Sequence, residues 1–383
     1  MSHESSLNVP PDELYTVEER PKVVVINNFP WPSSIYTVGA RNLSDALPDS
    51  TEVVNIMPHI SLLNAHTIGR AATGLEVGPS PLQSFVNFMA PRLTHRQLLK
   101  FLQKRKSDGW LVHYTSPYIN PIDNDPNNIV TMYENPFLMY SLTKNILTAN
   151  KSLAHRLMDR YAFKKFREFR NIITCSNYVK TSLEQYGVDS KITTIYPCVG
   201  KHIKPLSDKV SIRKELNLPL DKKLILHVSE SSNPNIIDRK NAKTVSALRR
   251  SLPSGFCIVK VGKRFENELA FTAVDDETIN KIYNACDALL APSIDEGFGL
   301  PVIEALATGL PVVASNIDVF KEIAAGCALF IDPLNVQDIL HGLLDVLNDP
   351  TSYVAAGLKR VKLFSLSEFS KNMNQYYSRI VTS

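Results

Sequence analysis

Short runs of apolar and β-branched residues recur along the whole chain, and several lack the apolar–polar alternation of a strand with one solvated face. KVVVI at 22–26, KLILHV at 223–228 and PVVAS at 311–315 are examples. Strands that are apolar on both faces suit a parallel sheet covered by helices. Helical patterns separate these runs, for example at 34–47, 239–250 and 278–285. The sequence therefore predicts an α/β fold with doubly wound, Rossmann-like sheets.

The expected strands form two groups. They lie at 22–26, 52–57, 110–114, 128–133, 171–175 and 192–196, and then at 222–229, 256–262, 287–291, 311–314 and 328–331. Between the groups, PCVGKHIKPLSD at 197–208 lacks periodicity and holds two prolines, which indicates a linker. A chain of 383 residues also suits two domains better than one. Two such domains would leave a ligand-binding cleft between the carboxyl ends of their sheets.

Composition excludes several classes of protein. Lys and Arg number 42 against 38 for Asp and Glu, an imbalance too small to indicate a nucleic-acid partner. The five cysteines form no CxxC pair, which indicates reduced thiols and neither a disulfide framework nor a zinc site. Residues 1–20 are acidic without an apolar core, unlike a signal peptide, and the uncharged stretch at 53–69 is too polar to span a membrane. We therefore expect a cytoplasmic protein.

Two basic helical segments allow two interpretations. Residues 92–106 hold six basic residues and no acidic one, and residues 151–170 hold seven basic residues against Asp159 and Glu168. The first segment also has apolar residues between its charges, which makes it amphipathic. Either the charges form a solvated helix face, or they attach the protein peripherally to an anionic membrane surface.

The most informative stretch is APSIDEGFGLPVIEALATGLP at 291–311. A strand ends at Ala291, a glycine-containing turn follows, and a helix begins near Leu300 with Pro301 in its first turn. The free N–H groups at such a helix start can bind a phosphate or a sugar hydroxyl. Glu296 in the loop can orient a sugar, and Glu304, one turn into the helix, can accept two hydrogen bonds from a ribose diol. The alternative is a plain turn in which both glutamates are caps or surface charges.

EGFGLPVIEALATGLPVVAS resembles the donor-site signature of family-4-type retaining glycosyltransferases with the GT-B fold. The similarity continues, in chain order, through NIITCSNYVKTSLEQYGVDSKITTIYPCV, KKLILHVSE, DRKN, VGKRFEN, INKIYNACDALLAPS and ALFIDPLNVQDILHGLLDVLNDP. Residues 171–350 follow the family pattern, and the first 170 follow it loosely. The resemblance implies an acceptor-side domain at 1–200 with an N-terminal extension at 1–20, a nucleotide-sugar domain at 201–366, and a C-terminal helix at 367–383 that crosses back to the first domain.

The resemblance also implies roles for individual residues. Glu304 would hold the ribose hydroxyls and Lys240 the distal phosphate, which makes Lys240 the candidate for stabilising the leaving group. The donor sugar would be held by the side chain of Glu296, a further catalytic candidate, and by the backbone amides of Gly297, Phe298 and Gly299. Leu300 and Val274 complete the predicted donor contacts.

Two departures from the family pattern affect the phosphate and sugar contacts. The family usually has an arginine directly after the first strand of the second domain, in a Gly-Arg pair, but this chain reads HVSES there. Arg239, next to Lys240, is the candidate substitute. Where the family often has Thr-x-His-Asp, this chain reads TMYEN. Tyr133 is either a catalytic group that hydrogen-bonds the sugar or leaving phosphate, or a core tyrosine with a satisfied hydroxyl.

The remaining candidates belong to the first domain. His113 is either a cleft histidine on the acceptor side or a structural one. INNFPWPSSI replaces the family's glycine-rich loop and offers Ser33 and Ser34 as small acceptor-side residues. DND at 123–125 matches a metal-binding pattern of another glycosyltransferase fold, but its proline- and asparagine-rich surroundings favour a surface turn. Because Lys240 and a helix N-terminus can hold the diphosphate, we expect neither a metal nor another cofactor.

The sequence thus predicts a retaining glycosyltransferase that moves a sugar from a nucleotide sugar to a hydroxyl of a glycan, lipid-linked or other acceptor. Two alternatives stay open. One is another GT-B enzyme, a phosphorylase or a sugar-nucleotide epimerase. The other is a catalytically silent protein that binds nucleotide sugars or glycans.

Overall fold

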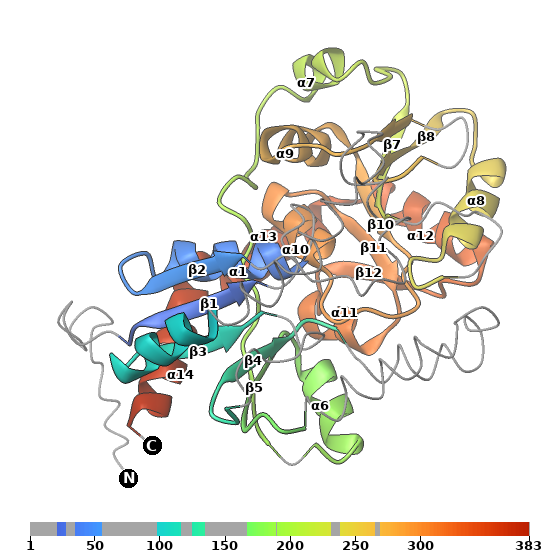
Figure 1. Cartoon of the computed structure of the whole chain (residues 1–383). Helices are drawn as coiled ribbons and strands as arrows, with labels where there is room; N and C mark the ends of the chain where they lie inside the picture. Colours follow the sequence, from blue (N-terminus) through green and yellow to red (C-terminus); the bar gives the residue numbers. More distant parts are fainter. Residues whose placement is uncertain are drawn as a thin grey trace, which may run out of the picture.

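Two parallel β-sheets, each flanked by helices, organise the chain (Figure 1). The computed structural model describes residues 21–27, 35–55, 98–115, 125–134, 167–188, 190–230, 238–264 and 269–382. Within these residues each sheet has six strands, and all strand pairs are parallel. The predicted α/β class with two Rossmann-like sheets is therefore confirmed.

The first sheet has the order β2-β1-β3-β4-β5-β6. Its strands are β1 (Val23–Asn27), β2 (Thr51–Asn55), β3 (Leu111–Tyr114), β4 (Ile129–Met132), β5 (Asn171–Thr174) and β6 (Lys191–Thr194), and its labelled helices are α1 (Ile35–Ala46) and α6 (Asn177–Gln185). Every residue of β1 is buried, as the lack of alternation in its sequence predicts.

The second sheet has the order β12-β11-β10-β7-β8-β9. Its strands are β7 (Lys223–Val228), β8 (Phe256–Val261), β9 (Leu269–Phe271), β10 (Ala288–Ala291), β11 (Val312–Ser315) and β12 (Ala328–Ile331). Its helices are α7 (Lys209–Glu215), α8 (Ala242–Ser251), α9 (Asp276–Ala285), α10 (Leu300–Thr308), α11 (Asp318–Ile323), α12 (Val336–Asn348) and α13 (Thr351–Arg360). The strand order reverses between β7 and β10. In an open α/β sheet, ligands bind beyond the carboxyl ends of the strands at such a reversal.

The predicted strands are all present, with ends that differ by a residue or two. The segment 195–208, between β6 and α7, contains no helix or strand. The three-residue strand β9 was not predicted, because a run as short as LAF carries no periodicity.

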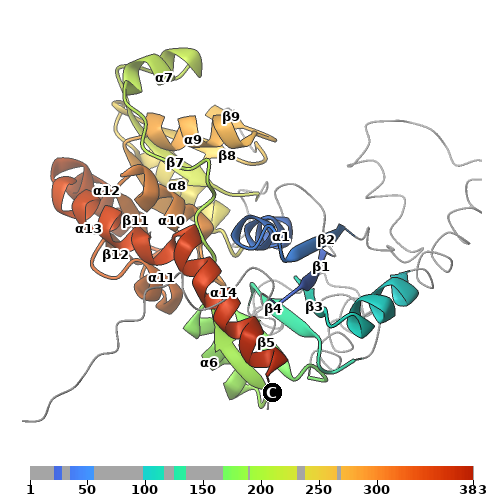
Figure 2. The same ribbon diagram turned by 90° about the vertical axis from the view of Figure 1, so that its left-hand side faces the viewer.

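The last helix returns to the first domain. After the short 3-10 helix η3 (Val361–Phe364), helix α14 (Leu366–Val381) packs beside α1, as Figure 2 shows. Its buried residues Phe369, Met373, Tyr376 and Tyr377 share one hydrophobic cluster with residues of β1 and α1. The chain therefore passes twice between the two sheets, once at 195–208 and once before α14.

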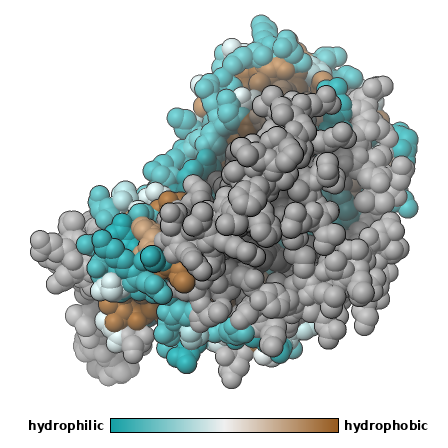
Figure 3. Space-filling view, in the orientation of Figure 1, coloured by the Kyte–Doolittle hydropathy of each residue, from teal (hydrophilic) through white to brown (hydrophobic). Residues whose placement is uncertain are grey.

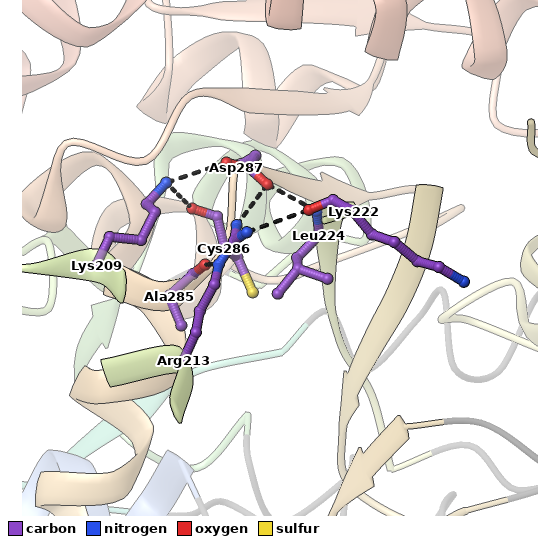
Figure 4. Close-up of polar contacts among 7 residues, drawn as sticks. All are labelled: Lys209, Arg213, Lys222, Leu224, Ala285, Cys286 and Asp287. Atoms are coloured by element: carbon purple, nitrogen blue, oxygen red, sulfur yellow. Dashed lines mark hydrogen bonds and ion pairs between the residues drawn. The ribbon is translucent and has the colours of Figure 1, made fainter. Parts of the chain in front are cut away.

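A network of ion pairs and hydrogen bonds holds α7 against the amino ends of β7 and β10, the two central strands of the second sheet (Figure 4). The Asp287 carboxylate accepts hydrogen bonds from Arg213 Nη2 at 2.6 Å and from the Leu224 amide at 2.7 Å. Lys209 Nζ lies 3.2 Å from the other carboxylate oxygen. Burial favours a higher pKa for Asp287, but the Leu224 amide and the two cations outweigh it and hold the pKa below its ordinary value.

One face of the molecule is mostly polar where its residues are described. On the face drawn in Figure 3, hydrophilic residues cover most of the coloured area and apolar residues gather in small regions. A membrane-spanning helix needs about 20 largely apolar residues. In the part of the chain that the structure describes, no helix reaches the length and hydropathy that a membrane span requires.

Candidate active site

A pocket lies at the point where the strand order of the second sheet reverses. It is lined by residues from the carboxyl ends of β7 and β10 and from the start of α10, including His227, Lys240, Ser293, Glu296 and Pro301. The cavity measures about 10 Å³, which is room for a single water-sized group. A larger ligand can therefore occupy it only if the side chains that line the pocket move.

Lys240 and Glu296, both predicted to contact the donor, form an ion pair in this pocket. Ser293 Oγ donates a second hydrogen bond, of 2.9 Å, to the same Glu296 oxygen. Burial favours a higher pKa for Glu296, but the charges of Lys240 and Arg239 and these hydrogen bonds hold it below its ordinary value. Glu296 is therefore an anion that can accept hydrogen bonds from a sugar once a ligand separates it from Lys240.

A turn between β7 and α8 aims Lys240 into the pocket. Asn241 ends this turn with a φ of 57°, a left-handed conformation that asparagine adopts more readily than most residues. The Asn241 amide group donates to the carbonyls of Pro292 and Pro333, and the Ile294 amide donates to the Arg239 carbonyl at 2.9 Å. The Lys240 turn and the Glu296 loop are thus joined. We did not predict the role of Asn241, because the predicted helix at 239–250 includes it, whereas α8 begins only at Ala242.

The helix that follows the loop begins as predicted. Gly299 is the N-cap of α10 with a φ of 103°, and a Cβ atom there would lie 2.6 Å from the Phe320 ring. Pro301 occupies the first turn. The Phe298 side chain packs among Tyr196 and Phe364, with ring centroids 6.0 and 5.7 Å away. Because that ring is buried, only the backbone of Phe298 can contact a ligand.

Glu304 lies one turn inside α10. Tyr283, a buried residue of α9, donates a hydrogen bond of 2.6 Å to Glu304 Oε2. Burial raises the pKa of Glu304 above its ordinary value. Among the described residues no group donates to the second carboxylate oxygen, which leaves Oε1 for a ligand. Leu300 and Val274, the other predicted donor contacts, are partly buried and pack against the main hydrophobic cluster.

The Glu296 loop also contacts the first domain. The carbonyl of Gly297 accepts hydrogen bonds from Ser176 Oγ at 2.7 Å and from Cys175 Sγ at 3.2 Å. A Cβ atom on Gly297 would collide with the backbone carbonyl of Tyr133. The loop therefore lies directly against the carboxyl ends of β4 and β5, and only glycine permits this approach.

Three further contacts cross between the domains near the loop. Tyr178 Oη donates to Asp295 Oδ1 at 2.9 Å, and burial raises the pKa of Asp295 to about 6. The Glu322 carboxylate accepts from the amides of Asn177 and Tyr178 at 2.7 and 3.0 Å, at the N-terminus of α6. Arg239 Nη1 lies 3.3 Å from Glu134 Oε1. Sequence reasoning missed the residues on the α6 side, although the Ser-Asn pair that begins α6 is a typical N-cap pattern.

Tyr133 does not present its side chain to the pocket. It is 7% exposed, belongs to the main hydrophobic cluster, and directs its hydroxyl against Gly39 of α1. Burial raises its pKa above its ordinary value. This is the packing of a core tyrosine, the second of the two interpretations that the sequence allowed.

His113 is buried at the centre of the first sheet, and its acceptor-side role is corrected to a structural one. Its Nδ1 lies 2.7 Å from Tyr377 Oη of α14, and its Nε2 lies 2.6 Å from Thr131 Oγ1 of β4. Burial lowers its pKa to about 3, so the ring is neutral at pH 7. Both ring nitrogens are occupied, and the histidine joins the C-terminal helix to the sheet.

Several other predicted features lie outside the described residues. These are Ser33 and Ser34, the first two residues of the DND pattern (Asp123 and Asn124), and residues 92–97 and 151–166 of the two basic segments. Asp125, the third residue of DND, is bound to Lys106 Nζ at 2.7 Å and accepts from the Asn127 amide, as a surface turn requires. No cluster of three or more metal-binding side chains occurs in the described ranges.

Part of the second domain matches a known family. Residues 266–360, which include the Glu296 loop and α10, match the family described as Glycosyl transferases group 1. The chain is 38% identical over 95 residues to O-antigen chain mannosyltransferase B of Escherichia coli, which covers 24% of this chain and 25% of that protein. It is 29% identical over 201 residues to O-antigen chain mannosyltransferase RfbU of Salmonella typhimurium, which covers 48% of this chain and 52% of that protein. The matches thus span about a quarter to a half of these relatives.

The fold is shared over nearly the whole chain. Anabaena HepE, in complex with UDP and glucose, superposes with a TM-score of 0.67 at 16% sequence identity, over 94% of this chain and 100% of that one. At this identity the similarity concerns the fold. The chain therefore has the GT-B fold, and residues 266–360 of its second domain match the glycosyl transferases of group 1, in agreement with the family-4-type resemblance of the sequence.

Proposed function

We propose that this protein is a retaining glycosyltransferase that moves a sugar from a nucleotide sugar to a hydroxyl group of a glycan or lipid-linked acceptor. The observation that carries the proposal is the Lys240–Glu296 pair at the carboxyl ends of β7 and β10, with Glu304 one turn into α10. These three side chains and the start of α10 offer a cation for phosphate, an anion for sugar hydroxyls and a carboxylate for a ribose. The names of the two mannosyltransferase relatives support sugar transfer, with mannose as one candidate sugar.

Binding of the donor would replace the ion pair between Lys240 and Glu296 with contacts from each of them to the donor. In the free protein Lys240 and Glu296 satisfy each other. When a sugar diphosphate enters, Lys240 would pair with the distal phosphate, and Glu296 would accept hydrogen bonds from the hydroxyls of the sugar. Each of the two charges keeps a partner throughout, so neither is left buried and alone, which would be strongly unfavourable.

Catalysis would consist mainly of stabilising the departing diphosphate. Negative charge grows on the distal phosphate as the glycosidic bond breaks, and Lys240 and the N-terminus of α10 gain attraction for it. A preorganised donor of this kind contributes about 2.7–4 kcal/mol to transition-state stabilisation. The sugar keeps its anomeric configuration if the acceptor hydroxyl attacks the face from which the diphosphate leaves. In that case the leaving phosphate itself accepts the proton of the acceptor hydroxyl. This scheme requires no metal ion.

A ligand panel tests the proposal directly. UDP, GDP, ADP and their sugar conjugates would be compared by thermal shift, with and without EDTA, using wild type, Lys240→Ala and the exposed control Lys243→Ala. One nucleotide should stabilise wild type and Lys243→Ala, by about 2.7 kcal/mol at 100 times its Kd. Lys240→Ala should respond less. A panel in which no nucleotide or nucleotide sugar shifts the wild-type protein would refute the proposal.

Two activity measurements separate the rival functions. Slow hydrolysis of the preferred nucleotide sugar in the absence of acceptor is expected of a transferase and not of a silent binding protein. Release of sugar phosphate from a glycan on addition of orthophosphate would instead indicate a phosphorylase.

A further inference from the structure

His227 is a buried polar residue on the floor of the pocket to which sequence reasoning assigned no role. It is the fifth residue of β7 and is 2% exposed. Its Nδ1 lies 3.3 Å from the carbonyl oxygen of Leu290 in the neighbouring strand β10. Its Nε2 is buried and has no hydrogen-bond partner among the described residues. An unsatisfied buried polar atom is unfavourable, so this nitrogen requires a partner that the described chain does not supply.

The contact with Leu290 determines which ring nitrogen carries the proton. A carbonyl oxygen only accepts, so Nδ1 must donate, and Nε2 of the neutral ring is left with a free lone pair. Burial lowers the pKa of His227 to about 4; the Leu290 hydrogen bond and Asp238 act in the opposite direction, and the nearby cations Lys260 and Lys240 add to the lowering. At pH 7 the pocket therefore contains a neutral imidazole whose Nε2 can accept a hydrogen bond and cannot donate one.

The surroundings of Nε2 define what can satisfy it. His227 lines the same cavity as Lys240, Ser293 and Glu296, and that cavity holds about 10 Å³. A water molecule or a single hydroxyl group fits this space. A phosphate oxygen does not suit it, because both the oxygen and the neutral Nε2 are acceptors. A hydroxyl donates to Nε2 and can at the same time accept from a neighbouring donor such as Lys240.

We propose that His227 is a specificity-determining residue whose Nε2 accepts a hydrogen bond from one hydroxyl of the transferred sugar. This inference rests on the proposed function and adds a second acceptor, beside Glu296, to the sugar end of the donor site. A site with a fixed neutral acceptor favours a sugar that places a hydroxyl at that point. It disfavours one that lacks this hydroxyl, because Nε2 is then left unsatisfied.

Calorimetric titration with two matched variants tests the inference. His227→Asn keeps a donor at the place of Nδ1 and has no group at the place of Nε2, whereas His227→Gln can place its amide oxygen near Nε2. The ligands are the nucleoside diphosphate selected by the panel above and its sugar conjugate. His227→Asn should leave the Kd of the diphosphate within about twofold and weaken the sugar conjugate about 5- to 10-fold, the scale of one neutral hydrogen bond. His227→Gln should recover most of that loss.

Deoxy analogues of the sugar extend the test to the unmodified protein. One deoxy analogue should bind wild type about 5- to 10-fold more weakly than the parent sugar conjugate, and His227→Asn should weaken that analogue no further. Histidine ¹⁵N NMR of wild type should also show the His227 Nε2 resonance shifting with the sugar conjugate but not with the diphosphate alone. The two wild-type readings hold even if a variant fails to fold.

The outcomes distinguish the inference from the function on which it rests. If diphosphate binding weakens as much as sugar binding, or strengthens towards pH 5 only when His227 is present, the ligand is the anion and the inference is overturned. If both variants bind the sugar conjugate like wild type, His227 is structural and the inference falls while the function stands. If folded wild type binds no sugar conjugate, the proposed function falls and the inference falls with it.

Discussion

Lys240 has a partner both before and after a ligand arrives, and its substitution should therefore affect catalysis more than binding. We expect Lys240→Ala to lower kcat by about 10²–10³, the effect of losing one preorganised donor, with a smaller rise in the KM of the donor. Lys240→Arg should recover part of the loss, because the charge persists while its geometry differs. Steady-state kinetics with Lys243→Ala as control check this. A kcat above about a third of wild type at saturating donor would make Lys240 a surface lysine.

Glu304 should act on the nucleotide rather than on the sugar. Tyr283 holds one of its carboxylate oxygens, so the carboxylate is oriented before a ligand binds. We expect Glu304→Gln to weaken free nucleotide and nucleotide sugar alike, by more than about tenfold, because hydrogen bonds to a charged group contribute about 1.5–3 kcal/mol. Titration calorimetry measures both affinities. Tyr283→Phe should give a smaller loss, and unchanged nucleotide affinity in Glu304→Gln would remove the assignment.

Asp295 should make stability depend on pH. Its pKa rises from the ordinary 3.8 to about 6 in the folded state, so the ionised carboxylate destabilises the fold. This penalty grows as the pH rises from about 4 to about 6 and is complete above that range; it amounts to at most about 3 kcal/mol. Asp295→Asn, which can still accept from Tyr178, should therefore raise Tm at pH 8 and lose this advantage by pH 4. The exposed Asp345→Asn is the control. A lower Tm than wild type at pH 8 would contradict the assignment.

At the scale of whole elements, Asp287 is the shared charge partner of Arg213 and Lys209 in α7. Asp287→Ala would leave Arg213, whose side chain is 8% exposed, without its charge partner. We expect a loss of about 3–5 kcal/mol, typical of breaking a buried ion pair. Lys209→Ala, at a side chain 45% exposed, should lose at most about 1 kcal/mol. Thermal denaturation of both variants measures the difference, and equal losses would show that the network acts as a surface ion pair.

Elements whose pattern is local could be predicted from the sequence. KVVVI and KLILHV form buried parallel strands because their composition excludes a solvated face. The N-cap role of Asp275 and the Pro301 start of α10 follow from residues within one turn of each other. The pairing of Lys240 with Glu296 could be anticipated only through a family pattern, because 56 residues separate them.

Other features of the site could not be predicted because they depend on distant packing. His113 joins Tyr377 across 264 residues, so no local pattern distinguishes it from a cleft histidine. Tyr133 follows β4 in a family-like position, but the proximity of α1 turns its hydroxyl into the core. The unpartnered nitrogen of His227 becomes apparent only when the Leu290 carbonyl fixes the other ring nitrogen.

At the scale of the whole molecule, the described part of the first basic segment, residues 98–106, leaves few charges for a membrane. Arg105 is bound to Glu52 at 2.8 Å and Lys106 to Asp125 at 2.7 Å, so the exposed Lys100 and Lys104 are the described residues that can meet a lipid surface. If the segment binds anionic vesicles, Lys100→Glu with Lys104→Glu should weaken binding by at least about 2 kcal/mol, and salt should weaken it further. Vesicle sedimentation tests this. Equal pelleting with neutral vesicles, or none with anionic ones, would exclude membrane attachment.

The return of α14 to the first sheet also constrains the order of events on the ribosome. Phe369, Met373 and Tyr377 complete the hydrophobic cluster around Val23 and Val25, but they are synthesised after the whole second domain. Domains usually fold as units while the chain emerges, the N-terminal one first. Here β1 is synthesised early, but α14, which packs against it, is synthesised late. The first domain therefore cannot reach its final packing until translation has passed residue 377.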